Sequence, residues 1–341
     1  MSYLRTGWIA SKEWVVETED GSLRPNFEFL KQKFGDCVVP VVAESSDYGS
    51  GARECHWYKT YDVPRYFRSD WINLEEWPTD GNPFQGDYRF VYIGPKDSWT
   101  GFHVDVLRSY SWSANVVGRK RWLMAPPGSE EWFANSPPVE GKELSVIGDI
   151  RKRQEVFSRA GVLDFIQEAG ETVFVPSNWF HQVHNLADTV SINHNWFNGT
   201  NGASVWRFLR SRALEVRREI EHCREALGED DFQKQIQLIM RADCRLSLSD
   251  WREVLEHICK RSKERSKGAA PTELLSIDSA DLNQADNRTR LRPFLAGDFS
   301  CGCDALCDSC ADKLLCIDHS VASNLLAELR DFAVTSGLSI D

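Results

Sequence analysis

Short β-like runs dominate the middle of the chain. They are bounded by Gly, Pro, Asn or Asp and cover residues 88–93, 101–107, 111–117, 121–124, 172–175, 181–185 and 189–196. Many short strands separated by turn residues are typical of an all-β sandwich or barrel. We therefore predict that this part of the chain folds as a β domain.

After residue 201 the apolar residues follow a helical spacing instead. One amphipathic helix begins near residue 203, and further helical stretches cover residues 232–240, 249–261 and 323–334. Near the N-terminus, residues 26–34 predict a helix that stops at Gly35, and residues 38–42 predict a buried strand. The expected fold is mainly β with flanking helices and a C-terminal helical segment.

These changes of pattern divide the chain into four parts. We expect a β domain in residues 1–200, with an N-terminal region at 1–60 and a barrel at about 85–200. A helical segment (201–262), a polar linker (263–299) and a cysteine-rich tail (300–341) follow. Within the barrel, the charged residues 140–155 predict a solvated insertion.

Composition and charge exclude several classes of protein. The 341 residues include 40 Lys and Arg and 51 Asp and Glu, which gives a net charge of −11 and argues against a nucleic-acid-binding protein. No apolar run approaches the roughly 20 residues that cross a bilayer, and the first twenty residues lack a signal-peptide core. We expect a cytoplasmic protein, with a nuclear location also open, and no membrane partner.

The segment around His103 carries the clearest chemistry. His103 and Asp105 are two positions apart and would project from the same face of a strand. An imidazole and a carboxylate in that arrangement form two corners of a facial iron site, and the third corner is then a later histidine. His181 is the best candidate, and His184 and His194 are alternatives.

The register after His181 decides between these histidines. We predict a hairpin that connects Asn185 to Ser191. With a three-residue turn at 187–189, His181, Asn193 and Asn195 share one face. A two-residue turn would put His194 opposite His181. His184 lies on the other face from His181 if the strand is regular.

Three separated motifs then occur in order: TGFHVD at residues 100–105, VGRKRW at 117–122 and GETVFVPSNWFH at 170–181. Together they resemble the JmjC family of iron- and 2-oxoglutarate-dependent oxygenases, over roughly residues 7–200. The resemblance implies a double-stranded β-helix of the cupin or jelly-roll type, with Fe(II) as cofactor and 2-oxoglutarate and O2 as cosubstrates. It is strongest to the hydroxylase branch, and within that branch to the lysyl hydroxylase of the eukaryotic translation release factor.

The resemblance also assigns roles to residues of the motifs. The family's metal ligands, which are also its catalytic residues, fall on His103, Asp105 and His181. The family's lysine for the distal carboxylate of 2-oxoglutarate, seventeen positions after the first histidine, falls on Lys120. Strand alternation would turn Lys120 away from its two flanking arginines.

Four further polar residues fall on cosubstrate positions of the family. Thr100 matches a hydroxyl that hydrogen-bonds 2-oxoglutarate, and Asn195 would line the open side of the iron. Asn193 stands where close relatives carry Thr, and Ser113 where relatives can carry Asn. These two residues depart from the family's pattern.

The tryptophans in and near the motifs and the cysteines of the tail leave two questions open. Five tryptophans near the motifs either pack in the core or form a cage for a methylated lysine: Trp99, Trp112, Trp122, Trp179 and Trp196. The tail between Cys301 and Cys316 has Cys-x-Cys and Cys-x2-Cys spacings that suit a zinc site, although the pattern is not a standard finger.

Three functions follow from this reading. The first is an Fe(II)- and 2-oxoglutarate-dependent dioxygenase that hydroxylates a carbon of a lysine in its protein substrate, the release factor. The second is a lysine or arginine demethylase of the JmjC type, against which Asp105, in place of Glu, argues. The third is a non-enzymatic binding scaffold. The helices after residue 203 could mediate dimerisation in any of the three.

Overall fold

The fold is known from a computed structural model, which describes residues 8–35, 60–78, 81–84, 86, 88–134, 149–266 and 308–340. The chain divides into two compact units, one of residues 1–64 and 86–196 and the other of residues 65–85 and 197–341. The expected strand at 38–42 and residues 267–299 of the expected linker (263–299) lie outside the described residues, whereas residues 263–266 are helical.

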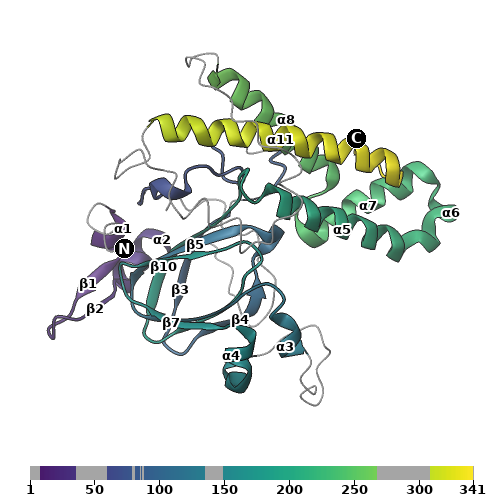
Figure 1. The fold of residues 1–341 in the computed structure, drawn as a ribbon. Coiled ribbons are helices and arrows are strands. Elements are labelled where there is room, and N and C mark those ends of the chain that lie inside the picture. The colour runs from purple at the N-terminus through teal and green to yellow at the C-terminus, as the bar shows by residue number, and fades with distance from the viewer. Residues whose placement is uncertain are drawn as a thin grey trace. The chain divides into compact units, whose positions relative to one another are not determined.

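The first unit is built on two four-stranded antiparallel sheets (Figure 1). The sheet we call the β10 sheet contains, in spatial order, β3 (Arg89–Gly94), β10 (Thr189–Trp196), β5 (Tyr110–Val117) and β8 (Thr172–Val175). The β9 sheet contains β4 (Trp99–Val104), β9 (Phe180–Asn185), β6 (Lys120–Ala125) and β7 (Leu163–Gln167). The predicted cupin-type β core is confirmed, whereas the strand β7 was not predicted.

Successive strands of the chain alternate between the two sheets, except that β6 and β7 are neighbours in the β9 sheet. The inner faces of the sheets meet in an apolar cluster, in which Trp122 and Met124 of β6 pack with Val175 of β8. This alternation is the winding of a double-stranded β-helix. It places the inward-facing side chains of eight strands around one interior.

Helices cover the outer face of the β9 sheet. The segment between β6 and β7 contains α3 (Glu130–Ala134), a 3-10 helix (Ile150–Val156) and α4 (Phe157–Ala160), and Figure 1 shows α3 and α4 beside β4 and β7. Ile150, only 1% exposed, packs with Phe102 and Leu123 of the sheet. The described part of the expected solvated insertion, residues 149–155, is largely exposed as predicted, and the buried Ile150 anchors it to the sheet.

The N-terminal region contributes a small hairpin between two helices. Its elements are α1 (Ala10–Glu13), β1 (Val15–Glu17), β2 (Leu23–Pro25) and α2 (Phe27–Phe34). The side chain of Asn26 caps α2 by accepting a hydrogen bond from the backbone N–H of Phe29, and Gly35 ends the helix. The predicted helix at 26–34 is confirmed.

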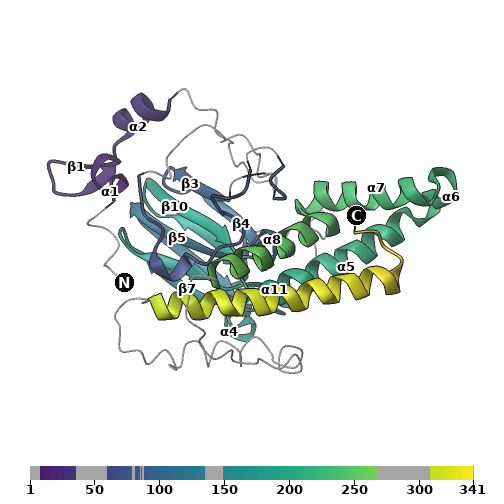
Figure 2. The same cartoon turned by 90° about the horizontal axis from the view of Figure 1, so that it is seen from above.

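The second unit consists mainly of helices, which run side by side in Figure 2. They are α5 (Gly202–Ile220), α6 (Arg224–Leu227), α7 (Glu229–Cys244), α8 (Leu248–Ser266) and α11 (Asp308–Ser336). The first three of the four helices predicted after residue 201 are confirmed. The last helix is much longer than the predicted 323–334, because its buried face continues N-terminally through Ala322 and Val321 to Asp318.

Residues 65–85 join this helical unit although they precede the barrel in sequence. Trp71 is 1% exposed, donates its backbone N–H to the carbonyl of Phe197 at 2.8 Å, and lies against the rings of Phe197 and Trp251. Phe84 packs on Phe197 as well. These long-range aromatic contacts have no counterpart in the local sequence pattern, and we did not predict them.

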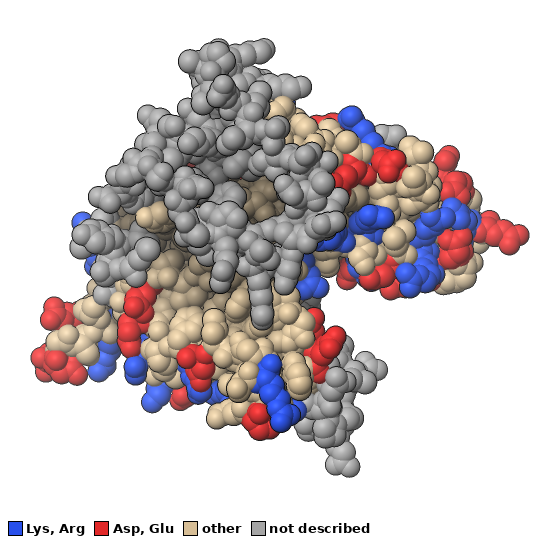
Figure 3. All heavy atoms as spheres, viewed as in Figure 1, with Lys and Arg blue, Asp and Glu red and all other residues tan. Residues whose placement is uncertain are grey.

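Charges on the helical unit are mixed in sign. Figure 3 shows acidic and basic side chains interspersed on its visible face. Arg212 pairs with Glu215, Glu219 and Asp243, and Arg224 pairs with Glu221 and Glu229, all on α5 to α7 or the turn between them. None of the described helices combines the length and the hydropathy needed to cross a membrane.

Candidate metal centre and its relatives

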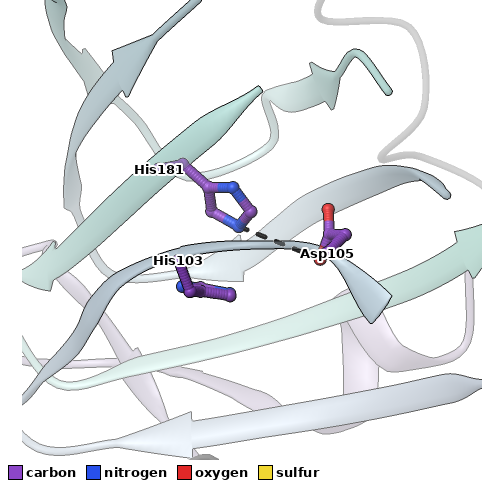
Figure 4. Close-up of side chains that lie close together, drawn as sticks. All are labelled: His103, Asp105 and His181. Atoms are coloured by element: carbon purple, nitrogen blue, oxygen red, sulfur yellow. Dashed lines mark ion pairs between the residues drawn. The ribbon is translucent and has the colours of Figure 1, made fainter. Parts of the chain in front are cut away.

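Three potential metal ligands converge at one end of the β9 sheet (Figure 4). His103 lies on β4, Asp105 directly follows that strand, and His181 lies on β9. His103 and His181 stand directly opposite each other in the ladder, with ring centroids 4.2 Å apart. One ligand atom from each of the three residues lies within 4.8 Å of the others, which is close enough to hold one metal ion.

A β-bulge brings Thr100 onto the same face as His103. Residues three apart on a regular strand face opposite ways, but β4 pairs Thr100 with Val183 and His103 with His181. Between these two pairs β4 advances by three residues and β9 by two. β4 therefore has one extra residue, at Gly101 or Phe102. Phe102 remains buried on the outer face, while Thr100 and His103 both face the interior.

Backbone carbonyls orient both imidazoles. His103 donates its Nδ1–H to the carbonyl of Gly101 at 2.8 Å, and His181 donates its Nδ1–H to the carbonyl of Trp179 at 3.4 Å. These bonds direct the Nε2 lone pair of each ring to the opposite side. Metal-binding histidines are commonly oriented in this way.

The environment of His181 keeps its ring neutral. Burial and the neighbouring His103 lower the pKa of His181 to about 4, although Asp105 acts in the opposite direction. A neutral imidazole is the form that binds a metal ion. The chemistry and spacing of the three residues thus fit a divalent metal.

Asp105 has a partner that the sequence did not suggest. The hydroxyl of Ser111 on β5 donates a hydrogen bond to Oδ2 of Asp105 at 2.7 Å, while Oδ1 lies 4.0 Å from Nε2 of His181. The carboxylate therefore has one oxygen held by the β10 sheet and the other directed toward the imidazoles. Ser111 was not predicted, because a serine six residues after an aspartate does not indicate a hydrogen bond between them.

Lys120 is buried on the inner face of the β9 sheet. Its flanking arginines pair on the other face, Arg119 with Glu168 and Arg121 with Asp164, as strand alternation predicted. Nζ of Lys120 donates a hydrogen bond to the hydroxyl of Ser191 on β10 at 2.6 Å. Burial lowers the pKa of Lys120 to about 7.

No carboxylate pairs with Lys120 among the residues that the structure describes. An ammonium group buried beside one hydroxyl is an unfavourable arrangement unless an anion joins it. Ser191 was not predicted, because a lone serine in a strand carries no signal of its partner across the barrel.

The remaining predicted cosubstrate residues also have inward positions. Ser113 and Asn193 are opposite each other on β5 and β10, and the serine hydroxyl donates to Oδ1 of Asn193 at 3.3 Å. Asn195 donates its Nδ2–H to the hydroxyl of Ser109 at 3.1 Å. Together with Ser111 and Ser191 they give the β10 sheet a polar inner surface, and their contacts with a cosubstrate stay predictions.

The predicted hairpin that connects Asn185 to Ser191 is wrong. β9 pairs with β4 and β6, whereas β10 pairs with β3 and β5, so the connection crosses from one sheet to the other. Asn193, Asn195 and His181 nevertheless all face the interior, from opposing sheets. The crossover occurs because each strand is paired on both edges by strands from elsewhere in the chain.

The alternative histidines both point away from the interior. His184 lies on the outer face of the β9 sheet, where it contacts Gln182 and stacks on Trp99. His194 lies on the outer face of the β10 sheet, and its Nε2 is 2.6 Å from the hydroxyl of Tyr61. Burial lowers the pKa of both rings, to about 4 for His184.

The five tryptophans near the motifs do not form one aromatic cage. Trp112, Trp122 and Trp196 are at most 5% exposed, and the first two lie on different sheets. Trp122 stacks on His181, whereas Trp99 stacks on His184 at the opposite face. Core packing is therefore the correct reading for the three buried rings.

The side chains of the possible zinc site between Cys301 and Cys316 lie outside the described part of the chain. Residues 301–307 lie outside it, and Cys310 and Cys316 fall within α11 at positions whose side chains are not described. Zinc binding by this tail stays a prediction.

Comparison with known proteins identifies the fold and the motifs. Residues 90–196 match the family model described as "JmjC domain, hydroxylase". A chicken (Gallus gallus) protein named 2-oxoglutarate and iron-dependent oxygenase JMJD4 is 39% identical over 277 residues, which are 69% of this chain and 62% of that protein. The human (Homo sapiens) protein of the same name is 36% identical over 296 residues, or 75% of this chain and 68% of that protein.

A plant relative carries a different name. Arginine-specific demethylase JMJ20 of Arabidopsis thaliana is 39% identical over 206 residues, which cover 57% of this chain and 44% of that protein. The chain spans 62% of the length of the chicken relative and 66% of that of a zebrafish (Danio rerio) relative. With the matched domain, the two-sheet core and these identities, the chain belongs to the JmjC family.

Proposed function

We propose that this chain is an Fe(II)- and 2-oxoglutarate-dependent dioxygenase that hydroxylates a carbon of a protein lysine side chain, with the translation release factor as substrate. The observation that supports it best is the cluster of His103, Asp105 and His181 on the same inner face as the buried Lys120. The relatives named as 2-oxoglutarate and iron-dependent oxygenases support the cofactor and the cosubstrate. The release factor rests on the resemblance of the three sequence motifs alone.

In the proposed site, His103, Asp105 and His181 hold the iron. A site of two histidines and one carboxylate leaves coordination positions open for a cosubstrate and O2. When bound, Fe(II) and 2-oxoglutarate supply the oxidation that inserts one atom of O2 into a substrate C–H bond and converts 2-oxoglutarate into succinate and CO2. The protein supplies the orientation of these groups and excludes water.

Lys120 binds the far carboxylate of 2-oxoglutarate in this proposal. Its ladder partner Asn185 lies four residues from His181 along β9, which is ~13 Å at the rise of a strand. The long lysine side chain and the imidazole shorten this gap to a length that a five-carbon dicarboxylate spans. A bound carboxylate also pairs with the buried ammonium and favours its charged form.

Other inward-facing groups complete the proposed cosubstrate site. Thr100 accepts a hydrogen bond from the backbone N–H of Val183 at 3.3 Å, so its own hydroxyl hydrogen can be donated to a carboxylate. Asn193, Asn195 and Ser113 add amide and hydroxyl groups from the opposing sheet. A wall of small polar side chains suits a polar cosubstrate.

Demethylation of a methylated arginine or lysine is the second candidate. It is favoured by the similarity to the protein named as an arginine-specific demethylase. The chemistry is the same up to the C–H bond, since hydroxylation of an N-methyl carbon is followed by loss of formaldehyde. The substrate therefore decides between the two functions.

The test is to incubate the protein with Fe(II), 2-oxoglutarate and either a release-factor peptide or methylated peptides. We expect one oxygen to be added to a lysine of the release-factor peptide, together with formation of succinate. Formaldehyde from a methylated peptide, without oxygen addition to the release-factor peptide, would favour the demethylase. Absence of succinate with every peptide would contradict both and favour the scaffold.

Two further parts of the proposal concern the whole protein. We propose that it acts in the cytoplasm, where its substrate would be found. Dimerisation through the helices of the second unit and the four-part division of the chain also stay predictions.

A further inference from the structure

We propose that Ser111 is a positioning residue of the metal centre, which holds the carboxylate of Asp105 so that one oxygen faces the two imidazoles. This inference rests on the proposed function, because it concerns the same three metal ligands. It adds a residue that lies outside the sequence motifs and in the opposing sheet.

The geometry of the carboxylate carries the proposal. Ser111 Oγ donates to Oδ2 of Asp105 at 2.7 Å, and Oδ1 lies 4.0 Å from Nε2 of His181. Asp105 follows the last residue of β4, so no strand ladder fixes its side chain. Ser111 is 8% exposed, which shields this hydrogen bond from competing water.

The turn between Asp105 and Ser111 has a backbone conformation that places the serine beside the aspartate. Leu107 and Arg108 both have φ of +55°, a left-handed conformation that side chains other than glycine rarely adopt. Leu107 is 2% exposed and anchors the turn in the core. Ser177, in the loop before β9, donates its hydroxyl to the carbonyl of Arg108.

Hydrogen bonds therefore link the turn to both ligand-bearing segments. Ser111 connects β5 to Asp105, and Ser177 connects the same turn to the loop that leads into His181. A strained turn persists only when surrounding contacts hold it, and such turns occur often at functional sites. The hydrogen bonds of Ser111 and Ser177 together fix the position of Asp105 relative to His181.

Partners of metal ligands affect affinity as well as orientation. A ligating carboxylate is itself commonly hydrogen-bonded, and loss of such a partner typically lowers metal affinity or activity 10- to 100-fold. Without Ser111, the Asp105 carboxylate can rotate about its last bond and lose the orientation of Oδ1. The serine thus acts through Asp105 and needs no contact with the metal.

The experiment measures binding of Mn(II) to the metal-free full chain by electron paramagnetic resonance of the free ion. We expect Ser111→Ala to raise the Kd for Mn(II) about tenfold or more. Ser111→Thr, which keeps a hydroxyl, should restore the Kd to within about threefold of wild type. Ser129→Ala is the matched control, because Ser129 is a buried serine, 3% exposed, whose hydroxyl has no hydrogen-bond partner among the described residues.

Thermal unfolding of the metal-free variants separates positioning from folding. A purely structural role would lower the unfolding temperature of Ser111→Ala and leave the Mn(II) affinity of its folded fraction unchanged, which would overturn the proposal. An equal Kd for wild type and Ser111→Ala would overturn it as well while leaving the proposed function intact. If wild type itself bound no Mn(II) or Fe(II), the proposed function would fall, and this inference with it.

Discussion

Replacement of Lys120 by Met should stabilise the protein in the absence of metal and cosubstrate. Lys120 is 5% exposed, and burial lowers its pKa from 10.5 to about 7. Between these two pH values the unfolded chain binds a proton that the folded chain lacks, so the wild-type protein becomes more stable as the pH rises. Burial of the charged lysine therefore destabilises the fold most at pH values below 7.

The size of the effect follows from the two pKa values. The fall from 10.5 to about 7 corresponds to about 5 kcal/mol when the lysine is fully charged. At pH 7, where half of the folded molecules carry the charge, the destabilisation is about 4 kcal/mol, and at pH 9 it is about 2 kcal/mol. Met resembles Lys in its unbranched shape but cannot donate the hydrogen bond to Ser191. The loss of this bond reduces the expected gain in stability by about 1 kcal/mol.

Lys120→Met should therefore be more stable than wild type by about 3 kcal/mol at pH 7 and by about 1 kcal/mol at pH 9. Urea denaturation of both proteins at pH 6, 7 and 9 measures this difference. Lys152→Met is the control, because Lys152 is exposed and its replacement should leave the stability unchanged. The reasoning is refuted if Lys120→Met gains no stability at pH 7, or if its gain is the same at pH 6 and pH 9.

The same substitution should have the opposite effect on function. Without the ammonium group, 2-oxoglutarate should bind at least tenfold more weakly to the Mn(II)-loaded protein, as calorimetry can measure. Greater stability together with weaker cosubstrate binding is the expected behaviour of a charged group that is kept buried for function. Unchanged cosubstrate affinity would remove Lys120 from the proposed site.

Three further predictions follow from the site and its supports. His103→Ala and His181→Ala should each abolish Mn(II) binding and succinate formation. His184 lies on the outer face, so His184→Ala should retain both. If only His184→Ala lost activity, the metal centre would be wrongly assigned. Because only the charged form of the buried lysine binds a carboxylate, the Kd for 2-oxoglutarate should rise up to about tenfold for each pH unit above 7, and a flat profile from pH 6 to 9 would contradict this. Gly118 has a φ of +90° at the turn between β5 and β6, where a methyl group would collide with the backbone of Asp188, so Gly118→Ala should destabilise the fold by about 3 kcal/mol in urea denaturation.

Several features of the site followed from sequence because they depend on short-range geometry. Strand alternation placed Lys120 on the opposite face from its neighbouring arginines and His184 on the opposite face from His181. Helix spacing located α5, α7 and α8 to within a few residues. Each of these predictions uses only the direction of side chains along one element.

The pairing of strands could not be derived in this way. The predicted hairpin between β9 and β10 does not form, because the two strands belong to different sheets. β7 was also missed, since its pairing with β6 depends on partners such as Arg121 and Asp164, which are far apart in sequence. Pairing is decided by competition among all strands for the same edges, and that competition is not local.

The sequence by itself determined the residue types of this site, the spacing of its motifs and the face on which most of its side chains lie. Only the tertiary structure decided that a bulge turns Thr100 to the same side as His103, and that serines from the opposite sheet contact Asp105 and Lys120. The physical reason is that the direction of a side chain is set by its own backbone, whereas its partner is set by which segments the folded barrel brings together.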